Sequence, residues 1–183
     1  MPGLEILLIE NILKNEDSKF KIFVETGTLH AQTVLNLEHK FDELHTIEVM
    51  KELYDSAIKY YNGEKIKFHL GDSIKTLPKV INTLNDNTIF FLDGHWSCGH
   101  TSFGEKHVPL FEELDSIMKF KHKSIIIIDD VRLFGYVSPV DWSEITVDKI
   151  LDKVKNRLKK HYTMPSRLDE NDRLVIHLHL MEH

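Results

Sequence analysis

Short apolar runs recur through the first 130 residues, and stretches with helical spacing of leucine, isoleucine and valine lie around them. The runs predict five strands, at 20–24, 43–49, 65–70, 88–93 and 123–130. Four consecutive isoleucines at 125–128 are typical of a strand buried on both faces of a parallel sheet. Strand and helix therefore alternate, which predicts an α/β fold with a doubly wound, mostly parallel sheet.

The pattern changes in residues 141–183. An amphipathic stretch at 141–161 predicts one helix, with Asp141 or Ser143 as its N-cap. Two apolar runs follow, at 162–168 and 173–181, and the polar sequence DEND between them predicts an antiparallel hairpin. We expect His177 and His179 on the less buried face of its second strand. The chain is predicted to be a single domain over 1–183, with an N-terminal helix in 1–19, a core in 20–140, and a helix plus hairpin in 141–183.

Composition and charge narrow the class of protein. The chain has 183 residues and a net charge of −6, without the basic stripe that is typical of nucleic-acid binding. A small-molecule ligand is therefore favoured over nucleic acid. The single cysteine, Cys98, cannot form an intrachain disulfide, and no apolar stretch approaches the length of a membrane span. These features predict a cytoplasmic protein that does not span a membrane.

Each of the five predicted parallel strands ends at or just before an acidic residue. These are Glu25, Glu48, Asp72, Asp93 and the pair Asp129 and Asp130. Ligands of open parallel sheets bind at the carboxyl ends of the strands, and an acid after the second strand is the usual partner of a ribose diol. Helix capping is an alternative role for Asp72, but glutamate is a weak N-cap. An acidic rim repels phosphates and attracts hydroxyls and cations.

The turns between these strands contain few glycines, and this restricts the ligand further. The segment GTLHAQT has one glycine where a dinucleotide-binding turn has three, and no GK[ST] sequence follows a strand. An NAD or nucleotide-sugar enzyme is therefore the less favoured alternative. A nucleoside without phosphates that carries a positive centre fits better, and S-adenosylmethionine is such a molecule.

Five segments together carry a resemblance to a known family: FVETGTLHAQTV, HTIEV, LGDSIKTLP, FFLDGHWS and IIIIDDVRLFG. In this order, each at a strand end, they resemble the motifs of a class I, Rossmann-like S-adenosylmethionine-dependent methyltransferase over residues 20–180. The resemblance implies a seven-stranded sheet. It also implies cofactor binding by Glu25, Thr26, Gly27, Thr28, Glu48, Val49, Gly71, Asp72, Ser73 and Asp93. Ala31 stands where the most similar subgroup has glycine.

The acids after the fourth and fifth strands should converge, because neighbouring strands lie about 4.8 Å apart. Asp93, Asp129 and Asp130 would repel one another unless a cation neutralises them, and oxygen ligands favour Mg²⁺, with Mn²⁺ or Ca²⁺ as alternatives. This set is similar to that of divalent-metal O-methyltransferases that act on catechols and sugars. The resemblance implies that the metal lowers the pKa of an acceptor hydroxyl, and that His95 or Asp93 removes its proton. The alternative is that Asp129 caps the loop and Asp130 pairs with Arg132.

The loop after Asp93 is rich in histidine. Its spacing, H-x2-C-x-H-x6-H from His95 to His107, matches no structural zinc pattern. We predict that it lines the methyl acceptor, with Trp96 and His100 as contacts and with Arg132 as an ion-pair partner or a ligand of an acidic acceptor group. Cys98 and His100 depart from the subgroup's loop, so an alternative is a protein that binds S-adenosylmethionine or S-adenosylhomocysteine without methyl transfer. A second subunit could complete the acceptor pocket, which leaves a homodimer open.

Overall fold

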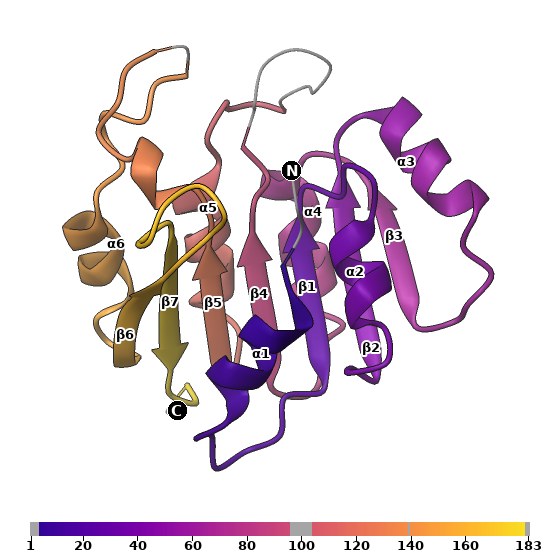
Figure 1. The fold of residues 1–183 in the computed structure, drawn as a ribbon, viewed down its shortest axis with the longest axis horizontal. Helices are drawn as coiled ribbons and strands as arrows, with labels where there is room; N and C mark the ends of the chain where they lie inside the picture. Colours follow the sequence, from indigo (N-terminus) through magenta and orange to yellow (C-terminus); the bar gives the residue numbers. More distant parts are fainter. Residues whose placement is uncertain (1–3, 96–103, 139, 182–183) are drawn as a thin grey trace.

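The computed structural model describes residues 4–95, 104–138 and 140–181. Its centre is one seven-stranded sheet with the order β3-β2-β1-β4-β5-β7-β6 (Figure 1). The strands are β1 (Ile22–Thr26), β2 (Glu43–Glu48), β3 (Ile66–Leu70), β4 (Thr88–Leu92), β5 (Ser124–Ile128), β6 (Leu158–Met164) and β7 (Arg173–Leu178). The first five strands pair in parallel, whereas β7 is antiparallel to both β5 and β6. The predicted seven-stranded, mostly parallel sheet with a terminal antiparallel hairpin is confirmed.

Helices cover both faces of the sheet. They are α1 (Ile6–Leu13), α2 (Gln32–Leu37), α3 (Lys51–Lys59), α4 (Ser73–Ile81), α5 (Leu110–Ile117) and α6 (Val147–Val154), with a short 3-10 helix at Val131–Leu133. Helices α4, α5 and α6 pack into one buried apolar cluster, and α1 and α2 pack into a second cluster on the other face. In the part of the chain that the structure describes, no helix combines the length and apolar character needed to cross a membrane.

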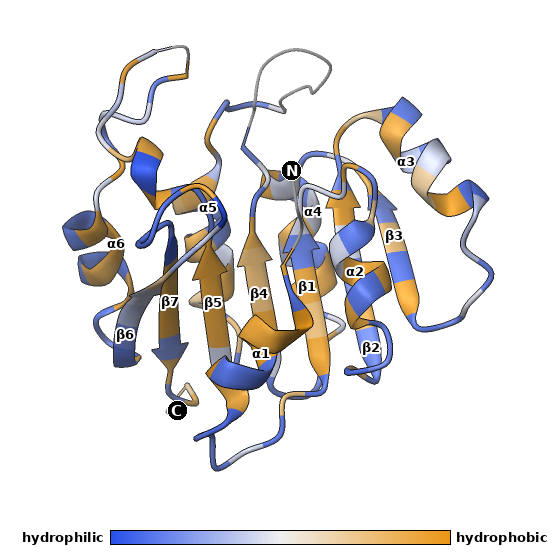
Figure 2. Cartoon of the chain, viewed as in Figure 1, coloured by the Kyte–Doolittle hydropathy of each residue, from blue (hydrophilic) through white to orange (hydrophobic). Residues whose placement is uncertain are grey.

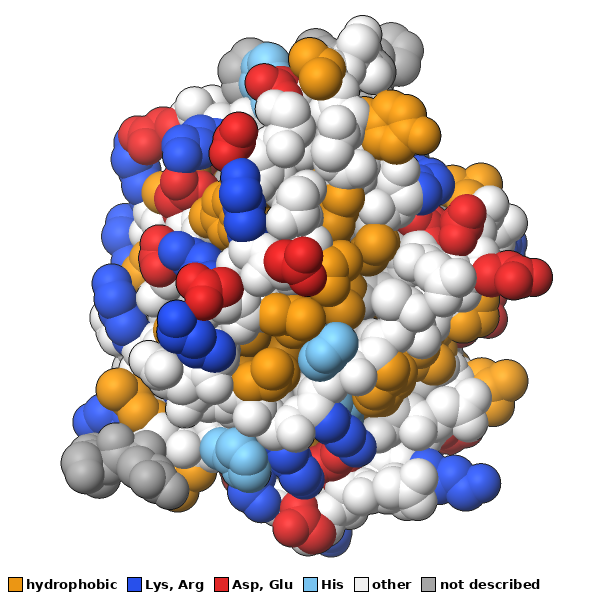
Figure 3. Space-filling view, turned by 90° about the vertical axis from the view of Figure 1, so that its left-hand side faces the viewer, with side chains coloured by type: hydrophobic (Ala, Val, Ile, Leu, Met, Phe, Trp, Pro, Cys, Tyr) orange, Lys and Arg blue, Asp and Glu red, His pale blue; other side chains and the backbone are white. Residues whose placement is uncertain are grey.

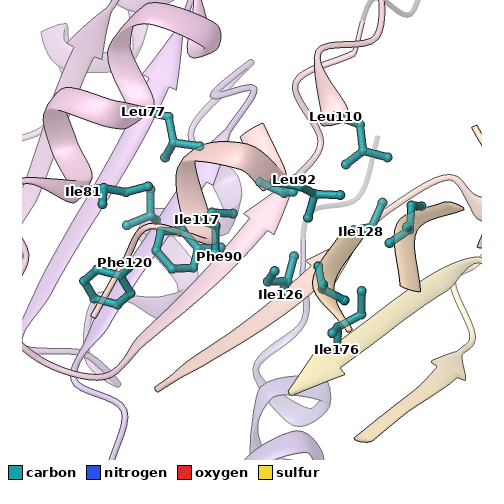
Figure 4. Close-up of a cluster of buried hydrophobic side chains, with 14 of the residues drawn as sticks. Leu77, Ile81, Phe90, Leu92, Leu110, Ile117, Phe120, Ile126, Ile128 and Ile176 are labelled. Carbon is teal, nitrogen blue, oxygen red and sulfur yellow. The ribbon is translucent and has the colours of Figure 1, made fainter. Parts of the chain in front are cut away.

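The central strands are apolar because both of their faces are covered. Every residue of β4 and β5 is buried, and Figure 2 shows these strands as the most hydrophobic part of the sheet. Alternate residues of β5 pack into the two apolar clusters: Ile126 and Ile128 lie in one, and Ile125 and Ile127 in the other. Figure 4 shows Ile126 and Ile128 beside Phe90 and Leu92 under the helix that carries Ile117. The run of isoleucines therefore has the two-sided burial that its sequence predicted.

The predicted helix at 141–161 is wrong in its extent. Helix α6 covers only Val147–Val154, and its N-cap is Thr146, whose hydroxyl accepts a hydrogen bond from the Lys149 amide at 3.2 Å. The sequence RLKKH largely belongs to β6, which also begins before the strand predicted at 162–168. Arg157 explains the change of direction. Its buried guanidinium donates to the carbonyls of Phe120 and His122, beyond the end of α5, and to that of His179 after β7.

The edge strand β6 alternates between half-buried and exposed residues. Figure 3 views the molecule from this side and shows acidic and basic side chains interspersed around apolar ones.

The order of the remaining strands determines where the site lies. The chain moves outward from β1 to β2 and β3, and then returns to the other side of β1 to form β4 and β5. Ligands of such sheets bind where the strand order reverses, at the carboxyl ends of the strands.

Candidate functional site

A cavity of about 260 Å³ lies at the carboxyl ends of β1, β2, β3 and β4, at the reversal of strand order. Its lining comprises Gly27, Leu29, Ile47, Glu48, Val49, Leu53, Gly71, Asp72, Ser73, Asp93, Gly94, His95 and Gly104. Most of the residues predicted to bind a cofactor therefore meet in one cavity. The exceptions are Glu25, Thr26 and Thr28, which are buried and do not line it.

The turn after β1 brings the backbone close to the end of β4. Gly27 has a φ of +87°, and a Cβ atom there would lie 2.5 Å from the carbonyl oxygen of Asp93. Only glycine fits this combination of left-handed backbone and close approach. Ala31, which stands where the similar subgroup has glycine, also has a positive φ of 56°. Its methyl group belongs to the apolar cluster under α1 and α2, so the substitution does not narrow the cavity.

Glu48 is held in place by backbone amides. One carboxylate oxygen accepts a hydrogen bond from the Leu29 amide at 3.0 Å, and the other accepts one from the Met50 amide at 2.9 Å. A carboxylate has about four lone-pair sites, so two bonds leave it able to accept hydroxyl groups as well. The side chain lines the cavity in this fixed position.

Asp72 joins two segments of the cavity wall. One carboxylate oxygen caps α4 by accepting from the Ile74 amide at 2.9 Å, and the other accepts from the Glu105 amide at 2.6 Å. The neighbouring Gly104 approaches Asp72 so closely that a Cβ atom would collide with the carboxylate. The capping role considered for Asp72 and its place in the cavity wall are thus both present. Sequence reasoning missed Gly104, whose need for glycine depends on this contact.

Glu25 supports the cavity from behind. It is 1% exposed and accepts a hydrogen bond from the Thr46 hydroxyl at 2.7 Å, which in turn lies 2.5 Å from the Thr28 hydroxyl. Burial raises the pKa of Glu25 to about 8. Glu25 and Thr28 therefore connect β1 to β2 beneath the residues that line the cavity.

Asp93, Asp129 and Asp130, which we call the acid centre, lie at the ends of the neighbouring strands β4 and β5. Asp129 accepts a hydrogen bond from the Arg173 Nε at 3.1 Å. Asp130 pairs with Arg132, and its second oxygen lies 2.7 Å from the His95 Nε2. The pairing of Asp130 with Arg132, which the sequence left as an alternative, is therefore present. The cation beside Asp129, Arg173, comes from β7.

The three aspartates differ in electrostatics. Burial, and then the charges of Asp129 and Asp130, raise the pKa of Asp93 well above its ordinary value. Burial also raises the pKa of Asp129, against the opposing charge of Arg173. Burial also tends to raise the pKa of Asp130, but hydrogen bonds and charge interactions with His95 and Arg132 outweigh burial. The pKa of Asp130 is therefore lowered. Asp93 has no arginine partner, and its buried Oδ1 accepts no hydrogen bond, although the His95 Nδ1 lies 3.8 Å away.

The grouping of ligand atoms differs from the predicted metal set of Asp93, Asp129 and Asp130. Asp93, His95 and Asp130 present atoms within 4.8 Å of one another, and so do Asp129, Asp130 and Asp172. The first group fits a divalent cation, since it includes the unbonded Asp93 oxygen. One imidazole among carboxylates suits Mn²⁺ or Zn²⁺ better than Mg²⁺, which favours oxygen ligands.

The remaining predicted residues fall into two groups. Trp96, Cys98 and His100 lie in 96–103, outside the described residues. Arg132 donates to Asp172 at 2.5 Å as well as to Asp130, so its guanidinium is engaged within the protein. Glu113 on α5 was missed: it is 2% exposed, and burial raises its pKa to about 7. It lies beneath Gly94, where a Cβ atom would be 3.3 Å from its Oε1.

The chain shares its fold with methyltransferases of known structure. No family model matches the chain, and no curated protein matches it. Among solved structures, those that share this fold include methyltransferases. An rRNA methylase from Streptococcus thermophilus aligns over 99% of both chains at 15% identity, with a TM-score of 0.58.

Two further structures were solved with S-adenosylhomocysteine. The N-methyltransferase NodS from Bradyrhizobium japonicum aligns over 96% of this chain and 85% of its own at 11% identity, with a TM-score of 0.60. Human methyltransferase-like protein 13 aligns over 89% of this chain and 73% of its own at 12% identity, with a TM-score of 0.56. At such low identity the likeness shows a shared fold.

Proposed function

We propose that this protein is an S-adenosylmethionine-dependent methyltransferase that methylates a hydroxyl group of a small acceptor. The observation that carries the proposal is the cavity at the reversal of strand order, with Glu48 fixed in one wall and Asp93 and His95 in another. The cavity joins a place for a nucleoside to a place for proton transfer. The bound S-adenosylhomocysteine in NodS and in human methyltransferase-like protein 13 supports this choice of cofactor.

In this proposal each wall of the cavity has a task. Glu48 accepts hydrogen bonds from the ribose hydroxyls, as acids after a second strand commonly do. Gly27 lets the backbone approach the cofactor, while Asp72 and Ser73 border the adenine. Asp93 supplies a carboxyl group beside the sulfonium end.

His95 is the proposed base. Its Nε2 lies 2.7 Å from Asp130, so in this role the ring donates from Nε2 to Asp130 and accepts the proton at Nδ1, which lies 3.8 Å from the Asp93 Oδ1. A carboxylate that holds an imidazole in one tautomer also stabilises the imidazolium that forms, as in hydrolase triads. His95 therefore removes the acceptor proton as the hydroxyl oxygen attacks the methyl group, and Asp130 orients the ring.

A more specific form of the proposal is that a divalent cation assists the methyl transfer. Asp93, His95 and Asp130 would hold it, and it would supply a lowered pKa of the acceptor hydroxyl. In that arrangement the imidazole is a ligand and not a base. Treatment with EDTA separates the two roles, because the His95 base works without metal and the ligand set does not.

The test begins with the cofactor. Isothermal titration should show binding of S-adenosylhomocysteine and none of NAD, and the reverse result would refute the cofactor assignment.

Release of S-adenosylhomocysteine is then measured with catechols, sugars and a structured RNA as acceptors. Asp130→Asn should lower turnover about a hundredfold or more, since general bases contribute 10²- to 10⁴-fold, while cofactor affinity stays within about twofold. RNA-dependent turnover would overturn the small-acceptor assignment. Light scattering tests whether the protein forms a homodimer, and cell fractionation tests the expected cytoplasmic location.

A second function has one observation in its favour. Asp129 and Asp130 are each paired with an arginine, which suits a protein that binds S-adenosylmethionine or S-adenosylhomocysteine without transferring the methyl group. Affinity for S-adenosylhomocysteine without turnover on any acceptor class would favour this reading.

A further inference from the structure

A second cavity, of about 230 Å³, lies between α1 and the turn that joins β6 to β7. It is lined by Glu5, Leu7, Leu8, Asn11, Met164, Pro165, Ser166, Arg167 and Arg173. Figure 1 shows α1 and this turn on the same side of the sheet. The second cavity shares no lining residue with the first, and the two are similar in volume.

Two polar connections join the second cavity to the acid centre. The first is direct, since Arg173 lines the cavity and donates from Nε to Asp129 at 3.1 Å. The positive charge of Arg173 also acts on Asp93, where it lowers the pKa and so opposes the effect of burial. The second cavity therefore reaches the acid centre through Arg173, which is not part of the lining of the first cavity.

The second connection runs through the turn itself. The Ser166 hydroxyl donates to Asp172 at 2.5 Å, and Asp172 also accepts from Arg132 at 2.5 Å. Arg132 then bonds to Asp130, the partner of His95. The cavity wall is thus fixed relative to the proposed base by a continuous series of hydrogen bonds.

The lining has the chemistry of an amphipathic anion site. Arg173 is 5% exposed, and a buried guanidinium has five N–H donors in a planar fork that matches a carboxylate. Arg167 stands at the mouth with its side chain 69% exposed, 3.2 Å from Glu5. Exposed pairs of this kind contribute only about 0–1 kcal/mol, so a ligand anion can replace Glu5. Leu7 is 65% exposed and, with Met164 and Pro165, offers an apolar surface.

We propose that this cavity binds a small organic acid, with a carboxylate on an apolar body, beside the acid centre. Arg173 and Arg167 recognise the carboxylate. Among the described residues Arg173 bonds to Asp129 through Nε alone, which leaves its two terminal nitrogens for the ligand, whereas Arg132, the arginine that the sequence suggested for this role, bonds to both Asp130 and Asp172. Anion binding in this cavity does not rest on the proposed function.

The test uses benzoate as the probe, with benzamide as its neutral analogue and acetate as its truncated one. In titrations of the protein saturated with S-adenosylhomocysteine, benzoate should bind at least about tenfold more tightly than either analogue, a difference of about 1.4 kcal/mol. The Arg173 Nε–H resonance should shift in the ¹H–¹⁵N spectrum as benzoate is added. Equal binding of benzamide, or an unshifted Arg173 resonance, would overturn the proposal. Tighter binding of phenyl phosphate than of benzoate would overturn the carboxylate assignment.

Arg167→Gln is the informative variant, because its exposed side chain is not needed for folding. It should weaken benzoate binding about fivefold and leave S-adenosylhomocysteine affinity unchanged, whereas Lys155→Gln, at an exposed residue just after α6 that lines neither cavity, should change neither. Unaltered benzoate affinity in Arg167→Gln would show that the arginines of this cavity do not bind the carboxylate as proposed. If benzoate binds selectively but S-adenosylhomocysteine does not bind, the proposed function fails and the anion site stands. The opposite pattern refutes the anion site alone.

Discussion

The two halves of the site hold their carboxylates by different means. In the half formed by β1, β2 and β3, backbone amides bind Glu48 and Asp72, most of them close to a strand end and one, that of Glu105, from the segment before α5. In the half formed by β4, β5 and β7, side-chain cations hold Asp129 and Asp130. Backbone amides keep no net charge and do not titrate, whereas arginine and histidine bring charge of their own. The first half is therefore suited to a fixed ligand shape, and the second to a change of charge during reaction.

The largest expected effect tests the rigidity of the first half. Gly27→Ala should lower the free energy of unfolding by about 2–4 kcal/mol, because the new methyl group both disfavours φ +87° and meets the Asp93 carbonyl. Urea unfolding measures this difference. Gly135→Ala is the matched control, since Gly135 has a φ of +81° with nothing within 4 Å of its Cβ position. It should cost only about 1 kcal/mol, from strain alone. Equal losses in the two variants would show that the approach of β1 to β4 is not tight.

A slightly smaller effect concerns Glu113, which lies beneath the turn between the halves. Its folded pKa of about 7 is above its unfolded value of 4.5, so between these values the folded protein binds more protons. Stability contributed by the protonated carboxyl is present at low pH and is lost as pH rises towards 7. Glu113→Gln removes this dependence, so its stability relative to the unaltered protein should rise by at most about 3 kcal/mol between pH 4.5 and 7.5.

Urea unfolding at several pH values measures that difference. Glu112→Gln serves as the control, because Glu112 is the neighbour on α5 and its side chain is 29% exposed. Its difference from the unaltered protein should stay nearly constant with pH. A constant difference for Glu113→Gln would mean that Glu113 is ionised in the folded protein at pH 5.

The next effect sharpens the contrast in ligand binding. Glu48→Gln replaces an acceptor oxygen by an amide nitrogen that faces a backbone N–H, so S-adenosylhomocysteine affinity should fall about 10- to 100-fold, or 1.4–2.7 kcal/mol. Asp129→Asn, on the other half, should change that affinity less than about twofold. Isothermal titration of both variants gives the comparison. Similar losses of S-adenosylhomocysteine affinity in the two variants would show that both halves of the site bind the cofactor.

The smallest effect is expected at Ala31. Glycine there would relieve the left-handed backbone, a gain of about 1 kcal/mol, but would remove a fully buried methyl group worth about 0.8 kcal/mol. The two terms nearly cancel, so Ala31→Gly should change stability by less than about 0.5 kcal/mol and leave cofactor affinity unaltered. A clear rise in S-adenosylhomocysteine affinity would show that the alanine does restrict the cofactor.

The first half of the site is predictable from sequence because its determinants are local. An apolar run ends, an acid follows, and the parallel arrangement brings Glu48 and Asp72 to one edge. The second half depends on partners that spacing does not reveal: Arg173 lies 44 positions after Asp129, at the start of β7. The burial of Glu113 is not visible in the sequence either, because it arises from contact with Thr26 of β1 and with Gly94 after β4.

The errors in the tail have the same origin. Helical spacing at 141–161 is real, but Arg157 satisfies the carbonyls after α5 only if the chain turns there into β6. His177, expected on the less buried face, is 1% exposed, because Glu16 lies 3.0 Å from its Nδ1 and covers it. His179 is exposed, as expected.

The position of β7 between β5 and β6 has a consequence for synthesis of the chain. Strand β5 ends at Ile128, but its outer partner begins only at Arg173. Until that segment leaves the ribosome, the backbone edge of the most hydrophobic strand remains unpaired, and open apolar edges invite pairing between chains. Aggregation of nascent chains should therefore depend on how quickly residues 129–178 are translated, and slow codons in that interval would lower the yield of folded protein.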